Sequence, residues 1–209
     1  QPVLDLDQYD AEDVGLVKID LLGLRTIDLY YEVLRELENQ GIKFNEDEID
    51  YNRDDVYAMF KTGNTELLFQ FESAPMQGAL ATIQPNSIDE LAMANALYRP
   101  GSMRYIDVYG RRLRGEEEVT YIHPDLEEIL KPTLGILVFQ EQLISIGRLA
   151  NMNNADDLRV ATAKKKIEMM QRVKPELFSG LKARGWTENQ LDSLWRTIIE
   201  FASYSLSEI

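Results

Sequence analysis

The feature that most constrains the fold is a succession of helix boundary signals in the last two thirds of the chain. From Pro75 onward, apolar residues recur at helical spacing, and polar capping residues stand between the apolar segments. Ser87 with Glu90, and Thr187 with Gln190, have the spacing of capping boxes. The pattern predicts helices at residues 75–83, 87–97, 103–113, 124–130, 138–151, 155–165, 168–183 and 187–203.

The first third of the chain has a different pattern. It predicts an irregular acidic segment at 1–13, a strand at 14–22, an amphipathic helix at 26–40 and, after a polar linker at 43–50, a helix at 54–61 and an extended segment at 67–71. We place a domain boundary near residue 45. The predicted fold class is α+β and predominantly α-helical, with a short strand-helix element followed by a helical domain.

Composition excludes several classes of site. The chain has no cysteine and a single histidine, His123, so neither a disulfide framework nor a thiolate or multi-histidine metal site can form. Any metal ion would need oxygen ligands, which Mg²⁺ prefers. No apolar run of 18 residues and no secretory leader occur, so we expect no membrane span and a cytoplasmic location. The start at Gln1 and the end soon after Tyr204 lead us to expect a piece of a longer protein.

Charge is distributed unevenly along the chain. The net charge of −14 disfavours a free-standing nucleic-acid binder, because phosphate contacts need Lys and Arg. Residues 159–184, however, hold eight basic and two acidic side chains. This stretch either faces phosphate or forms a solvated helix face.

One carboxylate, Asp20, lies in the apolar run at 17–22. An isolated buried carboxylate carries a large desolvation cost, so Asp20 must have a partner. The sequence leaves three alternatives open. Asp20 caps the following helix, pairs with Lys18 or Arg25, or binds a metal ion.

Six segments resemble, in the same order, the bacterial C-family replicative DNA polymerases, the DNA polymerase III alpha subunits. They are VGLVKIDLLGLR at 14–25, LFQFES at 68–73, ALYRPG at 96–101, HPDL at 123–126, GILVFQEQ at 135–142 and KKK at 164–166. The resemblance covers roughly residues 12–204. It implies that residues 1–45 are the C-terminal part of a palm domain and that 46–209 are a fingers domain truncated at its C-terminus.

The resemblance also implies a role for Asp20. It matches the third of three catalytic aspartates that bind two Mg²⁺ ions in the family. The first two lie in an upstream Pro-Asp-x-Asp-x-Asp run that this chain lacks. One carboxylate cannot build a two-metal site, so we expect the isolated chain to have no polymerase activity.

The remaining candidate residues come from the other matching segments. The resemblance implies nucleotide binding by Gln70, Glu72, Ser73, Arg99, Gln140, Arg159, Lys164 and Lys165, and DNA binding by Lys166, Arg172 and Lys174. Each has a structural alternative: Arg99 as a cap of its own helix, residues 140–142 as a hydrogen-bond network, and the cations as a solvated surface. Phe69 and Phe71 favour a core role, and His123 favours a helix cap.

This chain also departs from the family pattern. Ser102 stands where the family commonly has a second proline, Val160 replaces an Arg, and Ala163 replaces a Gly. A Lys and a His expected after Tyr204 are missing. These departures put the loop rigidity, one phosphate contact and closure over the nucleotide in doubt.

The implied function is template-directed addition of deoxynucleotides to a primer 3′ end by the parent protein. The implied ligands are Mg²⁺, deoxynucleoside triphosphates and primer-template DNA, with other replisome subunits contacting parts outside this chain. The alternative is a polymerase-derived helical module that has no catalytic role and only binds other proteins, which the acidic charge and the lost basic residues favour.

Overall fold

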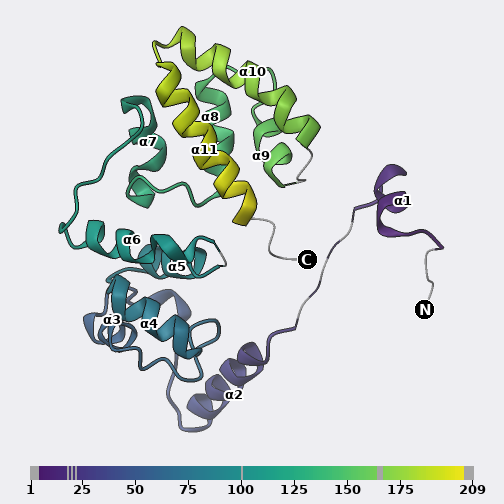
Figure 1. Cartoon of the computed structure of the whole chain (residues 1–209). Helices are drawn as coiled ribbons and strands as arrows, with labels where there is room; N and C mark the ends of the chain where they lie inside the picture. Colours follow the sequence, from purple (N-terminus) through teal and green to yellow (C-terminus); the bar gives the residue numbers. More distant parts are fainter. Residues whose placement is uncertain are drawn as a thin grey trace. The chain divides into compact units, whose positions relative to one another are not determined.

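The computed structural model describes residues 5–17, 19, 21, 23–99, 101–163 and 167–204. The chain divides into two compact units, residues 1–49 and 50–209 (Figure 1). Each unit is described here by itself. The predicted boundary near residue 45 assigns palm and fingers domains, and that assignment stays a prediction.

The first unit contains α1 (Gln8–Asp13), α2 (Arg25–Asn39) and the short 3-10 helix η1 (Glu46–Glu48). The prediction of an irregular segment at 1–13 is wrong for residues 8–13, which form α1. Asp7 caps the first turn of this helix, because its carboxylate accepts a hydrogen bond from the Asp10 N–H at 2.9 Å. The described residues of the predicted strand at 14–22 form a turn and open coil instead. A strand needs a partner for its backbone groups, and the described part of the chain contains no other strand.

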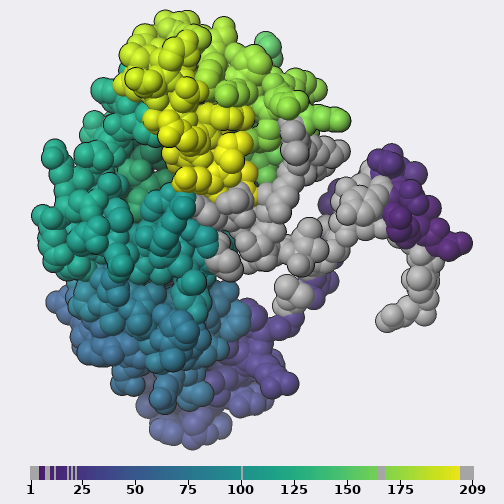
Figure 2. Space-filling view, in the orientation of Figure 1, coloured from purple at the N-terminus to yellow at the C-terminus, as the bar shows by residue number. Residues whose placement is uncertain are grey.

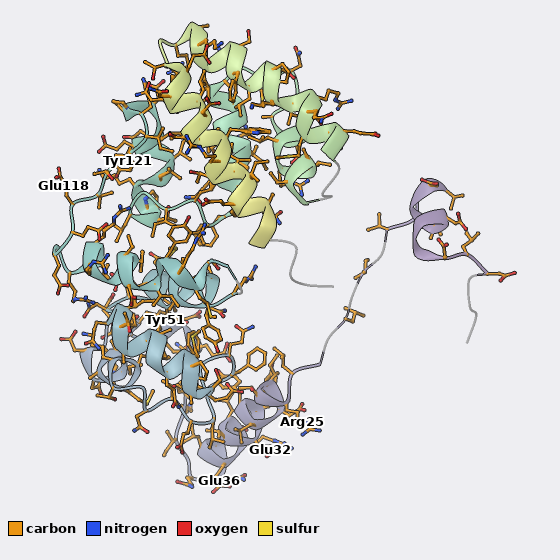
Figure 3. All side chains as sticks on the ribbon, viewed as in Figure 1. Arg25, Glu32, Glu36, Tyr51, Glu118 and Tyr121 are labelled. Carbon is orange, nitrogen blue, oxygen red and sulfur yellow. The ribbon has the colours of Figure 1, made fainter. Side chains whose placement is uncertain are left out.

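Helix α2 begins and ends close to where the sequence predicts. Gly41 follows it with a φ of +76°, and the N–H of Ile42 returns to the carbonyl of Leu37 at 2.9 Å, which closes the helix C-terminus. Figure 3 labels Arg25, Glu32 and Glu36 on this helix. No residue of α2 is buried, so its apolar residues take no part in a core formed by the described residues.

The second unit is built from helices only, among the residues that the structure describes. They are α3 (Asp54–Lys61), α4 (Ala74–Ile83), α5 (Ile88–Leu97), η2 (Met103–Tyr105), α6 (Ile106–Leu113), η3 (Pro124–Leu126), α7 (Glu127–Leu130), η4 (Lys131–Thr133), α8 (Gln140–Leu149), α9 (Asp156–Ala163), α10 (Ile167–Ala183) and α11 (Glu188–Tyr204). The predicted helices therefore all correspond to observed ones. Both capping boxes provide caps: Ser87 accepts from the Glu90 N–H at 3.2 Å, and Thr187 and Gln190 bond each other's N–H groups.

The second unit has two hydrophobic clusters. The first, which we call the α3–α6 cluster, includes the fully buried Met76, Leu80, Ile83 and Leu97. The second, the α7–α11 cluster, includes the fully buried Leu126, Leu143, Leu158 and Leu177. Each such side chain contributes roughly 1.5–3 kcal/mol of transfer free energy on burial. Figure 1 shows the helices that carry the two clusters, from α3 to α6 and from α7 to α11.

A short segment connects the two clusters. Ile136 belongs to the α3–α6 cluster, whereas the next residue, Leu137, belongs to the α7–α11 cluster. Both side chains are buried. The segment at 134–138 therefore passes between the two clusters and leads directly into α8.

Helix α10 packs unusually close to the end of α8. A Cβ added at Gly180 would lie 1.7 Å from the carbonyl oxygen of Ala150, which is far inside any permitted contact. The sequence requires glycine here because only a residue without a side chain allows the two backbones to approach this closely.

Replacing Gly180 with Ala should therefore destabilise the chain by about 2 kcal/mol or more, because α10 must move away from Ala150. Gly78→Ala is the matched control, since a Cβ at that exposed helical position meets no atom within 4 Å. The control should stabilise by roughly 0.5–1 kcal/mol through helix propensity. Urea unfolding measures both, and equal effects at the two positions would contradict the packing argument.

Candidate functional site

A cavity of about 230 Å³ lies where three distant segments of the second unit meet. It is lined by Ala96 near the end of α5, by Arg99 and Ser102 just after that helix, by residues 137–141 leading into α8, and by Phe201 near the end of α11. We call it the α5–α8 pocket. Figure 2 shows the teal surface of the α5–α6 region beside the yellow surface of α11. The pocket thus brings together two of the segments singled out in the sequence, at 96–101 and 135–142.

Arg99 is exposed just beyond the C-terminus of α5. Among the described residues, the Arg99 guanidinium has no hydrogen-bond or ion-pair partner, so the predicted alternative that its side chain caps α5 is not observed. Ser102 caps instead, because its hydroxyl donates toward the carbonyls of Leu97 and Arg99 at 3.1 and 3.2 Å. The serine that replaces a family proline therefore still fixes the turn that presents Arg99. Pro100 lies outside the described residues.

The three polar residues at 140–142 divide into two roles. Gln142 is buried, and its amide makes four hydrogen bonds: it accepts from the N–H groups of Val138 and Phe139 at 2.9 Å each, and donates to the Thr133 hydroxyl at 2.8 Å and the Ile129 carbonyl at 3.3 Å. Gln140 and Glu141 are exposed and line the pocket. A structural hydrogen-bond network is one of the alternatives predicted for residues 140–142. Of these three residues, Gln142 forms the network.

The segment at 68–73 is a series of turns and not the alternating extended segment predicted. Leu67 and Gln70 adopt left-handed backbone conformations, with φ of 67° and 68°. Such conformations are strained for residues other than glycine and gather at functional sites. The side-chain oxygen of Gln70 accepts a hydrogen bond from Asn95 at 2.8 Å, which ties this turn to α5.

The other residues of this segment have mixed roles. Phe71 packs edge-on against Phe60, with ring centres 5.4 Å apart, as the core prediction requires, but Phe69 is exposed. Ser73 caps α4 and lies 3.5 Å from the hydroxyl of Tyr98. Glu72 is exposed. Gln70, Glu72 and Ser73 are not among the residues that line the α5–α8 pocket.

Arg159 is held by an acidic neighbour on its own helix. Its guanidinium bonds both carboxylate oxygens of Asp156, at 2.6 and 2.9 Å. This hydrogen bonding is the main cause that raises the pKa of Arg159 and lowers that of Asp156, and the negative charge of Glu141 also raises the former. Arg159 therefore interacts electrostatically with Glu141, which lines the pocket at the start of α8.

The other described cations of the basic stretch also have partners. Arg172 pairs with Asp157 at 3.3 Å, and the ammonium of Lys174 lies 4.9 Å from the ring centre of Phe178 and 5.5 Å from that of Trp195. Lys164, Lys165 and Lys166 lie outside the described residues, as do Lys18 and Asp20. The structure thus places none of these predicted DNA or metal contacts.

His123 is a helix cap, as predicted. Its Nδ1 accepts from the Asp125 N–H at 3.1 Å, and its ring stacks on Trp186 with centres 4.4 Å apart. The Asp125 carboxylate accepts from Arg184 at 2.8 Å and from Trp186 at 3.2 Å, and these bonds hold its pKa below the ordinary value.

No three acidic or histidine side chains gather as a metal site in the part of the chain that the structure describes. The described residues therefore do not by themselves provide a site for the two Mg²⁺ ions that the resemblance implies.

A family model decides the family of this chain. The model for the bacterial DNA polymerase III alpha subunit finger domain matches residues 24–185. The chain belongs to this family. The match begins upstream of the boundary that we predict at residue 45, and it includes α2, which the resemblance assigned to the palm.

Full-length relatives agree with the family model. The DNA polymerase III alpha subunit of Aquifex aeolicus is 36% identical and covers 97% of this chain, which spans 18% of that protein. The alpha subunit of Halalkalibacterium halodurans is 36% identical over 95% of the chain and 18% of the protein. The alpha subunit of Bacillus subtilis is 34% identical over 97% of this chain, which spans 19% of that protein. The chain therefore spans less than a fifth of the length of these relatives.

Besides Arg99 and Gln140, the pocket is lined by residues that the sequence does not single out as binding residues, among them Ser102, Glu141 and Phe201. Glu141 lies in a matching segment and Ser102 directly follows one, whereas Phe201 lies outside all six. Their proximity depends on how α5, α8 and α11 pack, which the segments alone do not reveal.

Gln142→Met should destabilise the chain by about 2 kcal/mol, because two backbone N–H groups and the Thr133 hydroxyl lose their partner. Gln140→Met is the matched control, with the same chemical change at an exposed position two residues away. It should change stability by less than about 0.5 kcal/mol. Denaturant unfolding measures both, and a destabilised Gln140 variant would overturn this division of roles.

Proposed function

We propose that this chain is the fingers segment, with the end of the palm, of a DNA-directed DNA polymerase. The parent nucleotidyltransferase adds deoxynucleotides to a primer 3′ end in DNA replication. Residues 1–45 belong to the end of its palm and residues 46–209 to its fingers. The observation that carries the proposal is the α5–α8 pocket, which is lined from two of the matching segments in a chain of this family.

The pocket has the chemistry to hold an incoming deoxynucleoside triphosphate. Arg99 offers a planar, permanently charged group that bonds phosphate oxygens in pairs. The first turn of α8 adds backbone N–H groups and the positive end of a helix dipole. Gln140 offers an amide for ribose or base, and Leu137, Val138 and Phe201 offer an apolar wall.

Further contacts are proposed for other candidate residues from the matching segments and the basic stretch. Arg159, Lys164 and Lys165 contact the triphosphate, and Gln70, Glu72 and Ser73 contact the nucleotide from the turn beside α5. Lys166, Arg172 and Lys174 contact primer-template DNA. Arg172 and Lys174 would first have to leave Asp157 and the two aromatic rings that they contact here.

The catalytic metals are assigned to the complete parent protein. Asp20 supplies one ligand to the two Mg²⁺ ions, and the other carboxylates come from upstream of this chain. The two ions would supply charge neutralisation and activation of the primer hydroxyl. The isolated chain, with one of the three aspartates, is inactive.

The parent is proposed to act in the cytoplasm with other replisome subunits that bind outside this chain. No helix among the described residues is both long enough and apolar enough to span a bilayer.

Arg99→Ala in the full-length parent should raise the KM for deoxynucleoside triphosphates at least tenfold, because the pocket loses its phosphate-binding cation. Arg148→Ala is the control, since it removes the same charge from the last turn of α8, away from the pocket. Primer extension at varied nucleotide concentration measures both. An Arg99 variant with an unchanged KM would overturn nucleotide binding at this pocket and favour the protein-binding alternative.

The ion pair between Asp156 and Arg159 gives a second test, in which replacing each partner should change the KM for nucleotide in opposite directions. Arg159→Ala should raise the KM for nucleotide about tenfold, because a phosphate contact is lost. Asp156→Asn should lower it about threefold, because the guanidinium no longer has a competing carboxylate. A purely structural pair would instead give the same sign for both variants, since each removes the same interaction.

A further inference from the structure

The α5–α8 pocket carries two opposite charges that do not neutralise each other. Among the described residues that line it, Arg99 is the cation and Glu141 is the carboxylate. Both residues are exposed, and no ion pair joins these two side chains or either of them to another described residue. Each charged group can therefore bond a ligand in the pocket without first leaving a protein partner.

The carboxylate of Glu141 has a fixed origin at the start of a helix. Glu141 lies in the first turn of α8, where the helix dipole favours a negative charge. Arg159, a cation that interacts electrostatically with Glu141, is itself bonded to both carboxylate oxygens of Asp156. The Ser102 hydroxyl of the same pocket already donates to the carbonyls of Leu97 and Arg99. Glu141 is thus an acceptor for which the described part of the pocket supplies no donor.

The chemistry of a carboxylate limits what Glu141 can bond in a nucleotide. An ionised carboxylate accepts hydrogen bonds and donates none, and it repels phosphate. The phosphates of a nucleotide therefore belong on Arg99, and Glu141 needs an O–H or N–H donor. A deoxynucleotide has one hydroxyl donor on its sugar, the 3′-hydroxyl, and further donors on its base.

The base donors do not suit a fixed residue of a template-directed enzyme. The four bases present different patterns of donors and acceptors, so a carboxylate that bonds one of them would disfavour the others. The 3′-hydroxyl is common to all four deoxynucleotides.

We propose that Glu141 is a specificity-determining residue that accepts a hydrogen bond from the 3′-hydroxyl of the incoming deoxynucleotide while Arg99 holds its phosphates. The inference rests on the proposed function of the pocket and adds a selection for nucleotides that can be extended further. A nucleotide without the 3′-hydroxyl would leave the Glu141 carboxylate in the occupied pocket without a donor, which is costly.

Single-nucleotide primer extension by the full-length parent tests this contact. The kcat/KM for each deoxynucleoside triphosphate is compared with that for its 2′,3′-dideoxy counterpart, which lacks only the 3′-hydroxyl. The variants are Glu141→Ala, which removes the acceptor, and Glu141→Gln, which keeps one acceptor oxygen without the charge. Glu128→Ala is the matched control, because Glu128 is also an exposed glutamate in the first turn of a helix but does not line the pocket.

We expect Glu141→Ala to reduce the preference for the deoxynucleotide over its dideoxy counterpart about tenfold, because a charge-assisted hydrogen bond is lost. The whole loss should fall on the deoxynucleotide and be similar for all four bases. Glu141→Gln should lose about threefold, since a neutral acceptor is weaker. Glu128→Ala should leave the preference unchanged.

Three outcomes of Glu141→Ala contradict the proposal. An unchanged preference would mean that no 3′-hydroxyl contact exists. An equal loss with both nucleotides that added Mg²⁺ restores would assign the carboxylate to a metal ion, and a loss confined to one base would assign it to that base. Arg99→Ala, measured in the same assay, separates this inference from the proposed function: a raised KM for both nucleotides keeps the pocket as the nucleotide site even if the Glu141 contact fails, whereas an unchanged KM removes both.

Discussion

The amide of Gln142 is the interaction on which the arrangement of the second unit depends. It bonds the backbone of Val138 and Phe139 on one side and Thr133 and the Ile129 carbonyl on the other. These bonds fix the short segment that passes from the α3–α6 cluster into α8. Because the amide is buried, each lost bond would leave a polar group without water as a substitute. The same segment lines the α5–α8 pocket through Leu137, Val138 and Phe139.

A second constraint is that most cations in the described helices already contact a carboxylate or an aromatic ring. Arg159 is bonded by Asp156, Arg172 by Asp157, and Lys174 lies over two aromatic rings. Arg104, Lys182 and Arg184 likewise form ion pairs with carboxylates. Ligand binding by these cations therefore has to compete with existing contacts, whereas Arg99 has no such competitor among the described residues.

The sequence predicts the helices well and the irregular parts poorly, for physical reasons. Helix boundaries depend on local signals such as Thr187 with Gln190 and Gly41, which act within one turn and are visible in the chain. The segment at 67–71 is predicted to be extended because it is a short apolar run, but Leu67 and Gln70 take left-handed conformations that local pattern cannot indicate. The predicted strand at 14–22 fails for the opposite reason, since a strand depends on a distant partner.

The site shows the same division. The resemblance implies nucleotide binding by Arg99 and Gln140, and both residues line the α5–α8 pocket. It could not distinguish Gln140 from Gln142, since both are glutamines in an identical chemical setting, two positions apart. Only the direction in which α8 turns decides that one is buried and the other exposed.

The loop between α6 and η3, on which Figure 3 labels Glu118 and Tyr121, has a consequence for how this unit can vary. It joins two groups of helices that each have their own core, and Gly115 turns it with a φ of +72°. Extra residues inserted there would lengthen a surface connection without opening either core, at a small cost in loop-closure entropy. Ile136, which lies between α7 and α8 in the chain but packs in the α3–α6 cluster, would still hold the two groups of helices together. This loop is therefore the place where related chains can differ most in length while keeping the same two halves.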